Sequence, residues 1–216
     1  GYFKKITNQS LRMSSEQKYK EGDGLRLSFE SSNRRELLIL TDKQQMYKAR
    51  VSDFDDCKAS VLGVYLPAKL GMDEGETPLY ALLPGDYKGS MVVAFQNGKA
   101  ARFSLQSFET KTNRRRLSGA YSDKSPAVGF FFPVDDETEI TMFSTANRAL
   151  TFRAGMLDIK ATRSTQGVQT MVLRGKHTVT RACRTEDANL LDQARYRCRS
   201  IPSIGALLTE DQLKFE

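Results

Sequence analysis

The chain has 216 residues and a formal net charge of +7, with 33 lysines and arginines against 26 acidic residues. It contains one histidine and no tryptophan, which argues against a Ser-His-Asp triad and a histidine-rich metal site. The cysteines Cys57, Cys183 and Cys198 form no C-x-x-C pair, so neither a disulfide framework nor a zinc site is expected, and a reducing, cytosolic setting is indicated. The basic excess favours polyanionic partners.

The chain opens on residues 1–6, which match only the second strand of a hairpin that recurs further on. There is no initiator methionine, no secretory signal, and no apolar run approaching the roughly 18 residues of a membrane helix. We expect a C-terminal fragment of a larger soluble protein, in which residues 1–216 form a single domain.

Three stretches align without gaps as copies of this hairpin: residues 37–54, 91–108 and 140–157. A glycine of a following element also aligns, as Gly63, Gly119 and Gly167. A unit that recurs every roughly 50 residues predicts the blades of a repeat array. The predicted fold is all-β.

The second strand of each copy alternates between two faces. One face carries Ile6, Ala49, Phe103 and Phe152, and the residues before them on the other face include Lys5, Lys48 and Arg102. This period of two is typical of half-buried strands. It predicts that the apolar face packs and the basic face meets solvent. Asn97-Gly98 marks the hairpin turn of the second copy.

Residues 185–216 break the repeat and are expected to be a less regular tail. Thr185, followed by two acidic residues, predicts the N-cap of a short helix over 185–194. Because residues 1–6 supply only half a hairpin, we expect 168–183 or 195–199 to provide the missing strands of the first blade and to close the ring, which would remove exposed edges.

Three motifs carry a family resemblance: Gly-Tyr-x-Lys-Lys at residues 1–5, the repeated Leu-Leu-x-x-Thr hairpin with a basic second strand, and Gln166-Gly-Val168. Together they make residues 1–181 similar to the C-terminal domain of type IIA topoisomerase A subunits, namely the A subunits of DNA gyrase and of topoisomerase IV. The resemblance implies a β-pinwheel, a propeller-like ring whose blades exchange strands, here with about four blades. It also implies a basic outer rim that binds and bends duplex DNA.

Gyrase subunits carry a box, Gln-Arg-Arg-Gly-Gly-Lys-Gly, before the strand that starts with the recurring glycine. Alignment on Gly119 brings residues 113–119 into register with the box, where Arg114, Arg115 and Gly119 match and the other four positions do not. The degenerate box favours a topoisomerase IV-like or diverged gyrase-like subunit.

Cations spaced along successive strands would lay a basic stripe around a ring and could neutralise DNA phosphates without reading bases. The predicted DNA-binding residues are Lys5, Lys48, Arg50, Lys99, Arg102, Arg114, Arg115, Arg116, Arg148, Arg153, Arg163, Arg174 and Lys176. The run from Arg114 to Arg116 is the strongest of these, since bidentate guanidinium groups suit phosphate. No catalytic residue, metal or cofactor is expected in this domain.

The predicted function is sequence-nonspecific binding and bending of double-stranded DNA by a non-catalytic domain. The expected partners are duplex DNA, the rest of the topoisomerase A subunit and, through it, the ATPase subunit of an ATP-dependent type II enzyme, in the bacterial cytoplasm at the nucleoid and without a membrane. Two alternatives stay open: a propeller that scaffolds protein partners, which calls for an exposed ring of aromatics, and an RNA-binding module, which calls for exposed stacking aromatics beside the basic stripe.

Overall fold

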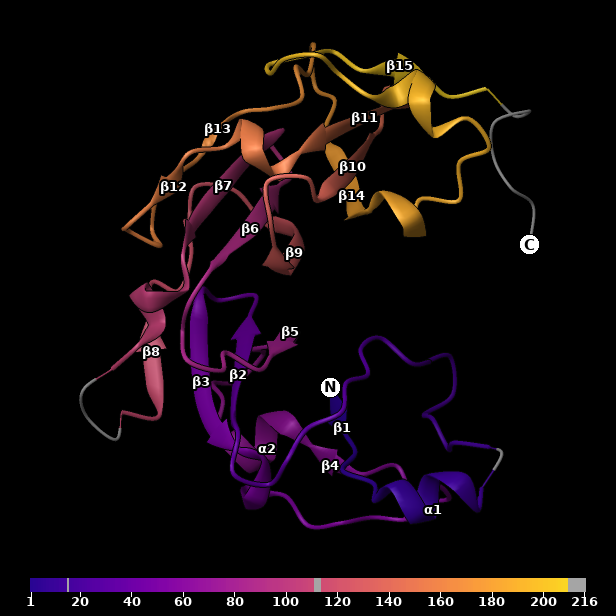
Figure 1. Ribbon diagram of the computed structural model, residues 1–216, viewed down its shortest axis with the longest axis vertical. Helices are drawn as coiled ribbons and strands as arrows, with labels where there is room; N and C mark the ends of the chain where they lie inside the picture. Colours follow the sequence, from indigo (N-terminus) through magenta and orange to yellow (C-terminus); the bar gives the residue numbers. More distant parts are fainter. Residues whose placement is uncertain (15, 111–113, 210–216) are drawn as a thin grey trace. The chain divides into compact units, whose positions relative to one another are not determined.

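The computed structural model describes residues 1–14, 16–110 and 114–209 (Figure 1). It divides into two compact units: Gly1–Asp86 with Thr110–Ser118, and Tyr87–Glu109 with Gly119–Glu216. Strands dominate both units, and the described α-helices are the short α1 (Asn8–Arg12) and α2 (Leu66–Leu70). The predicted all-β fold is confirmed.

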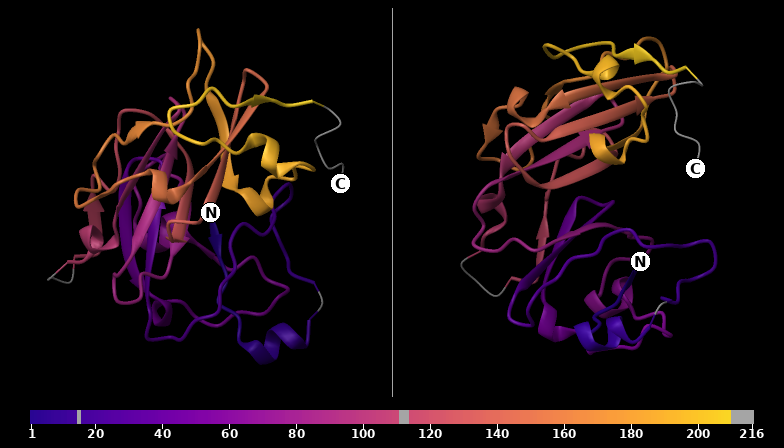
Figure 2. Two further views of the ribbon diagram at one scale, coloured as in Figure 1. Left: turned by 45° about the horizontal axis from the view of Figure 1, so that its top comes forward. Right: turned by 45° about the vertical axis from the view of Figure 1, so that its right-hand side comes forward.

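Each predicted hairpin forms the centre of a sheet, as Figures 1 and 2 show. The three hairpins are β2 (Glu36–Thr41) with β3 (Gln45–Arg50), β6 (Ser90–Phe95) with β7 (Lys99–Ser104), and β10 (Glu139–Ser144) with β11 (Arg148–Arg153). All three turns contain a residue with positive φ at the same place, Gln44, Gly98 or Asn147. Each hairpin then ends in a 3-10 turn, respectively η1 (Val51–Asp53), η2 (Leu105–Phe108) and η3 (Ala154–Met156).

Two further kinds of strand complete each sheet. An outer strand pairs with the first hairpin strand: β5 (Pro78–Leu82) with β2, β9 (Ala127–Val134) with β6, and β14 (Val179–Arg184) with β10. An inner segment from further along the chain pairs with the second hairpin strand: β8 (Arg116–Ser118) with β3, β12 (Ile159–Lys160) and β13 (Val168–Gln169) with β7, and β15 (Ala206–Leu207) with β11. A fourth, two-stranded sheet pairs β1 (Tyr2–Phe3) with β4 (Val64–Tyr65).

The inner segments are exchanged between repeats. β4 follows the hairpin β2–β3 but pairs with β1, β8 follows β6–β7 but pairs with β3, and β13 follows β10–β11 but pairs with β7. This is the strand exchange that the family resemblance implies, and the three full sheets with the two-stranded one fit the expected four or so blades.

The apolar face of the hairpins packs as predicted. Ala49, Phe103 and Phe152 are 6%, 0% and 1% exposed, and only Ile6 stays partly open. Ala49 lies in the core of the first unit beside Leu37 and Phe54, while Phe152 lies in the core of the second unit. Burial of these side chains is the main source of the folding free energy, because it scales with the apolar area removed from water.

The alignment of the recurring glycine was wrong at one position. Val64, Val168 and Ala206 pair with equivalent residues of their sheets, so Gly63, Gly167 and Gly205 occupy one structural position. In the sheet of β3 the equivalent pair is Leu117 with Met46, which puts Arg116 there and Gly119 three residues later. A Cβ at Gly63, Gly167 or Gly205 would lie 2.1–2.5 Å from a carbonyl oxygen of the paired strand, whereas a Cβ at Gly119 would meet nothing within 4 Å.

The proposed ring closure by the C-terminal segments is also wrong. Within the described residues, β13 pairs with β7, β14 pairs with β10, and Arg197 forms a parallel bridge with Thr151. These segments therefore complete the second and third hairpin sheets and none of them supplies a strand to β1.

The short helix predicted over 185–194 is replaced by two 3-10 turns, η4 (Thr185–Asp187) and η5 (Gln193–Tyr196). Thr185 does not cap them, because its hydroxyl is buried and bonds that of Thr141 at 2.9 Å. Leu190 and Tyr196 are each 1% exposed in a small core with Phe143. The burial of these two side chains in the core outweighs the helix propensity of the local sequence.

Candidate nucleic-acid interface

The basic position that recurs on the second hairpin strands is covered, contrary to prediction. The side chains of Lys5, Lys48 and Arg102 are only 15%, 14% and 4% exposed. Their ion-pair partners are, in the same order, Asp56 at 3.2 Å, Glu36 at 3.7 Å and Asp136 at 2.6 Å. In the third hairpin the position is Thr151, whose buried hydroxyl bonds that of Thr141 at 2.7 Å. The exchanged segments run beside this position, as the bridge from Lys5 to Asp56 shows, and they leave little room for a DNA phosphate.

Arg102 departs furthest from the predicted role. Its Nε donates to Ser90 Oγ at 2.8 Å, and one terminal nitrogen donates to Asp136 Oδ1 at 2.6 Å and to the carbonyl of Ala154 at 3.1 Å. A guanidinium that is buried and bound in this way ties β7 to the neighbouring hairpin. We therefore leave Arg102 out of the candidate interface.

Three other predicted cations are engaged within the protein. Arg116 donates two hydrogen bonds to the carboxylate of Asp73, which lowers the pKa of that carboxyl, and its guanidinium lies 5.6 Å from the centre of the Tyr47 ring. Arg153 pairs with Glu137 at 3.2 Å. Arg163 donates to the carbonyls of Gly119 and Ser107 at 2.9 and 2.7 Å, and burial lowers the pKa of its guanidinium.

Five exposed arginines gather at one end of the first hairpin sheet. They are Arg34, Arg35, Arg50, Arg114 and Arg115, and we name them the sheet-end arginine cluster. Strand pairing brings them together. Arg50 pairs with Glu36, the Val51 amide donates to the backbone carbonyl of Arg35 at 3.0 Å, and the Lys48 amide donates to the backbone carbonyl of Arg115 at 2.8 Å. Adjacent strands lie about 4.8 Å apart, so the five side chains start from three neighbouring strand ends.

The cluster carries uncompensated charge. Across the part of the chain that the structure describes, the guanidinium groups of these five arginines form no ion pair with a carboxylate. The carboxylates nearest in register are already engaged, because Glu36 pairs with Lys48 and Asp53 accepts from the Arg50 amide at 2.8 Å. Sequence reasoning missed Arg34 and Arg35, although an Arg-Arg pair directly ahead of the first hairpin was a usable signal. The first residue of the aligned box, Asn113, lies outside the described residues.

A second group of cations lies beside the hairpin turns of the other unit. It comprises Lys99, Arg148, Arg174 and Lys176, the turn-side basic set. The backbone of residues 170–178 links the two turns, because Gly98 O accepts from the Met171 amide at 2.9 Å and the Thr145 amide donates to Thr178 O at 2.9 Å. Arg174 and Lys176 are exposed on this link, and Arg148 donates to the carbonyl of Gly205 at 2.8 Å.

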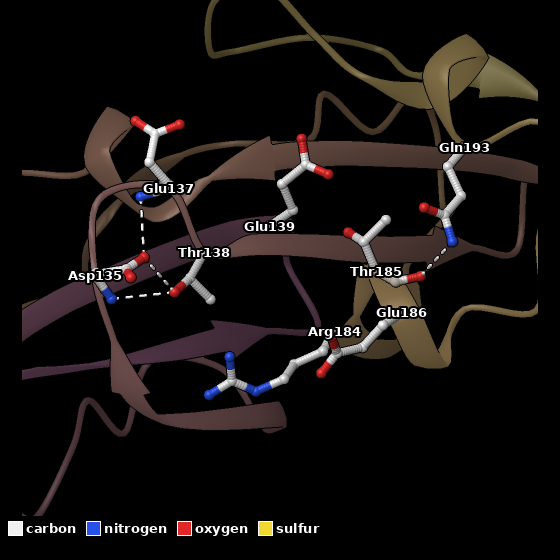
Figure 3. A pocket seen from close by; sticks show the side chains of 8 residues that line it. All are labelled: Asp135, Glu137, Thr138, Glu139, Arg184, Thr185, Glu186 and Gln193. Atoms are coloured by element: carbon white, nitrogen blue, oxygen red, sulfur yellow. Dashed lines mark hydrogen bonds between the residues drawn. The ribbon is translucent and has the colours of Figure 1, made fainter.

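The opposite end of the third hairpin is acidic. A pocket there is lined by Asp135, Glu137, Thr138, Glu139, Arg184, Thr185, Glu186 and Gln193 (Figure 3). Hydrogen bonds from Thr138 lower the pKa of Asp135, and Glu139 holds Arg197 by two bonds of 2.7 and 2.9 Å. Carboxylates repel phosphate, so this end of the sheet does not suit a nucleic-acid contact.

The described residues contain no group of three or more His, Cys, Asp and Glu side chains that could hold a metal ion, and no helix long and apolar enough to cross a membrane. The three cysteines are free thiols, and burial raises the pKa of Cys183 and Cys198.

Strand exchange between successive hairpin repeats defines the fold of this chain as a β-pinwheel. No family model and no curated protein matches the sequence. Solved structures do match. The C-terminal domain of DNA topoisomerase IV superimposes with a TM-score of 0.72 at 21% identity, over 85% of this chain and 58% of that one.

Two further domains have the same fold. The C-terminal domain of DNA gyrase A has a TM-score of 0.54 at 14% identity, over 82% of this chain and 60% of that one. The E. coli ParC C-terminal domain has a TM-score of 0.61 at 13% identity, over 91% of this chain and 85% of that one. The chain thus spans a little over half of the first two domains. At these identities the likeness concerns the fold, and it confirms the predicted pinwheel.

Proposed function

We propose that this chain binds double-stranded DNA through its phosphates, without reading base sequence, and that it catalyses no reaction itself. The observation that carries the proposal is the sheet-end arginine cluster, with five exposed guanidinium groups on adjacent strand ends and no carboxylate partner among the described residues. The pinwheel fold, shared with domains of DNA topoisomerase IV and DNA gyrase A, supports it.

The physical basis is counterion release. A guanidinium offers a planar fork of donors that matches two phosphate oxygens. Each phosphate that a protein cation neutralises frees condensed counterions, so binding weakens with salt by a slope of about 0.9 per contact. Cations that are already paired, such as Arg116 and Arg153, contribute less because they must first leave Asp73 and Glu137. The turn-side basic set would give a second, separate contact.

The test is fluorescence anisotropy with a random-sequence duplex of about 40 base pairs across a salt series, comparing Arg114→Ala/Arg115→Ala with a matched control. The control, Arg153→Ala/Arg197→Ala, removes the same charge from exposed arginines that are bound to Glu137 and Glu139. We expect the first variant to bind weaker and to lose about 1.8 from the salt slope, since two contacts disappear. If both variants lost the same affinity and the same salt slope, the effect would come from net charge alone, and the proposed site would be contradicted.

We further propose that the bound DNA is bent and that the chain serves a bacterial, ATP-dependent type II topoisomerase of the topoisomerase IV or diverged gyrase type. In that setting it would act with the rest of the A subunit and the ATPase subunit, in the cytoplasm at the nucleoid, and would need no cofactor of its own. Neutralising phosphates along one side of a duplex favours bending. Energy transfer between dyes at the two ends of the same duplex would report it, and unchanged end-to-end distance at saturation would refute bending while leaving binding intact.

The alternative function, a scaffold that binds protein partners, calls for a ring of exposed aromatic side chains around the hairpin repeats. The large exposed aromatics of the described residues are Tyr2, Tyr19, Phe29 and Tyr65, all within the first unit. Because all four lie in one unit, they do not form a ring of aromatics around the repeats. A parallel titration with single-stranded RNA and DNA separates the nucleic-acid alternatives, and absence of duplex binding at low salt would favour the scaffold.

A further inference from the structure

The one histidine of the chain, His177, lies on the backbone that links the two hairpin turns of the second unit, next to members of the turn-side basic set. The link makes a tight turn there, because the His177 amide donates to the carbonyl of Arg174 at 3.3 Å and Gly175 has a φ of 60°. The His177 side chain is exposed on this turn beside Lys176. Imidazole is the side chain that ordinarily gains its charge between about pH 5 and 8, so one titratable group lies among permanent cations.

The hydrogen bonds of His177 suit both charge states of its ring. Nδ1 lies 3.0 Å from Thr145 Oγ1, and the same oxygen accepts from the Thr178 amide at 3.0 Å. A hydroxyl has one proton to donate and two lone pairs, so it can donate to a neutral Nδ1 or accept from a protonated one. Within the described part of the chain, Nε2 forms no hydrogen bond. A charged ring therefore keeps its anchor on Thr145 and offers the Nε2–H to an oxygen from outside the protein.

The segments around His177 are basic. Backbone hydrogen bonds hold residues 95–99, 144–148, 170–181 and 203–208 together, and none of these four segments contains an aspartate or glutamate. Their cations are Lys99, Arg148, Arg174, Lys176 and Arg181. Segment 121–127, whose Pro126 carbonyl accepts from the Gln96 amide at 2.9 Å, contributes Asp123, which pairs with its neighbour Lys124 at 3.5 Å. A protonated His177 thus adds to a positive surface, and an anion from outside would relieve the repulsion.

We propose that protonated His177 is a phosphate contact beside the turn-side basic set, and that it makes duplex binding by this chain stronger as the pH falls. The inference rests on the proposed function, since duplex DNA is the source of the phosphate. The charged ring would donate its Nε2–H to a phosphate oxygen while Nδ1–H stays on Thr145. DNA phosphates remain ionised throughout the range in which imidazole titrates, so the change in charge is on the protein. One more neutralised phosphate adds about 0.9 to the salt slope.

The test is an anisotropy titration of the random-sequence duplex at about pH 8 and about pH 5.5, at matched ionic strength. We expect affinity to rise about three- to fivefold at the lower pH, as for one exposed ion pair, and the salt slope to steepen by about 0.9. His177→Gln, which can still bond Thr145 but carries no charge, should show neither change. His177→Lys, charged at both pH values, should show the tighter binding and the steeper slope at both. The side chain is exposed, so both variants should keep the original urea midpoint at the higher pH.

The outcomes separate this inference from the proposed function. Duplex binding with equal salt slopes at the two pH values, or a pH dependence that survives in His177→Gln, would overturn the inference and leave the proposed function intact. Absence of duplex binding at both pH values would refute both. NMR of the single imidazole gives an independent readout, because a ligand that prefers the protonated ring must raise the proton affinity of that ring. The ring signals should titrate at higher pH when the duplex is present, and an unmoved titration would contradict the contact.

Discussion

Arg102→Met should destabilise the fold without weakening DNA binding. The substitution keeps the buried aliphatic stem but removes three hydrogen bonds, to Ser90, Asp136 and Ala154. Ser90 and Ala154 are 2% and 0% exposed, so two acceptors lose their partner out of reach of solvent, at about 1–3 kcal/mol each. The Asp136 side chain is 74% exposed, and its ion pair adds no more than about 1 kcal/mol. The expected loss in the free energy of unfolding is about 3 kcal/mol.

Urea unfolding and duplex binding, measured on the same samples, check this. A loss of that size lowers the urea midpoint by about 1 M at an unchanged slope. Arg153→Met is the control, because its side chain is 51% exposed and its partner Glu137 is 78% exposed, so it should cost less than about 1 kcal/mol. An Arg102→Met protein with the original midpoint and weaker DNA binding would refute the structural role and restore the rim role that the sequence alone predicts.

Three further results are expected. Gly167→Ala should lower the melting temperature far more than Gly119→Ala. A Cβ at position 167 would lie 2.1 Å from a carbonyl oxygen, whereas a Cβ at position 119 would meet nothing within 4 Å and only the positive φ opposes it. Equal shifts in melting temperature would contradict the register of the exchanged strands. Burial and a hydrogen bond to the Glu76 carboxylate raise the pKa of Tyr47 from 10.0 to about 12. The folded state therefore favours the neutral phenol, so the contribution of Tyr47 to stability should be complete below about pH 10 and should be lost as the pH rises toward 12. Urea midpoints measured across this range should show the loss, and Tyr47→Phe should remove it. Asp73→Asn should break the ion pair between Arg116 and Asp73 and make Arg116 available to a phosphate. The slope of log affinity against log salt for duplex binding should then become steeper by up to about 0.9. An unchanged slope in the anisotropy titrations would place Arg116 away from the DNA.

The hairpins were predictable from the sequence because their determinants are local. A continuous apolar run from Met91 to Phe95, the turn at Asn97-Gly98 and the short strand from Lys99 to Ser104 specify β6 and β7 without reference to the rest of the chain. The tail was harder, because Thr185 has a good local helix-start pattern but its hydroxyl bonds that of Thr141, which lies far away in the sequence.

The candidate site was predicted in part. Arg114 and Arg115 are exposed, but Arg34 and Arg35 join them only because β3 pairs with β2 on one edge and with β8 on the other. Sequence alternation also assigned Lys48 to a solvent face, while the structure pairs it with Glu36 and leaves its side chain 14% exposed. A two-faced pattern reports which face is polar and does not report what later covers that face.

The sequence by itself determined that the chain is an array of β-hairpins with a basic surplus, since both properties depend on residue order and composition alone. The tertiary structure decided which segments exchange between repeats and which cations remain free. Strand exchange joins residues such as Val168 and Ala100, whose pairing depends on the path of the chain between them. Likewise Arg102 forms an ion pair with Asp136, 34 residues away, so only the packing of the repeats decides that its guanidinium is not available to DNA.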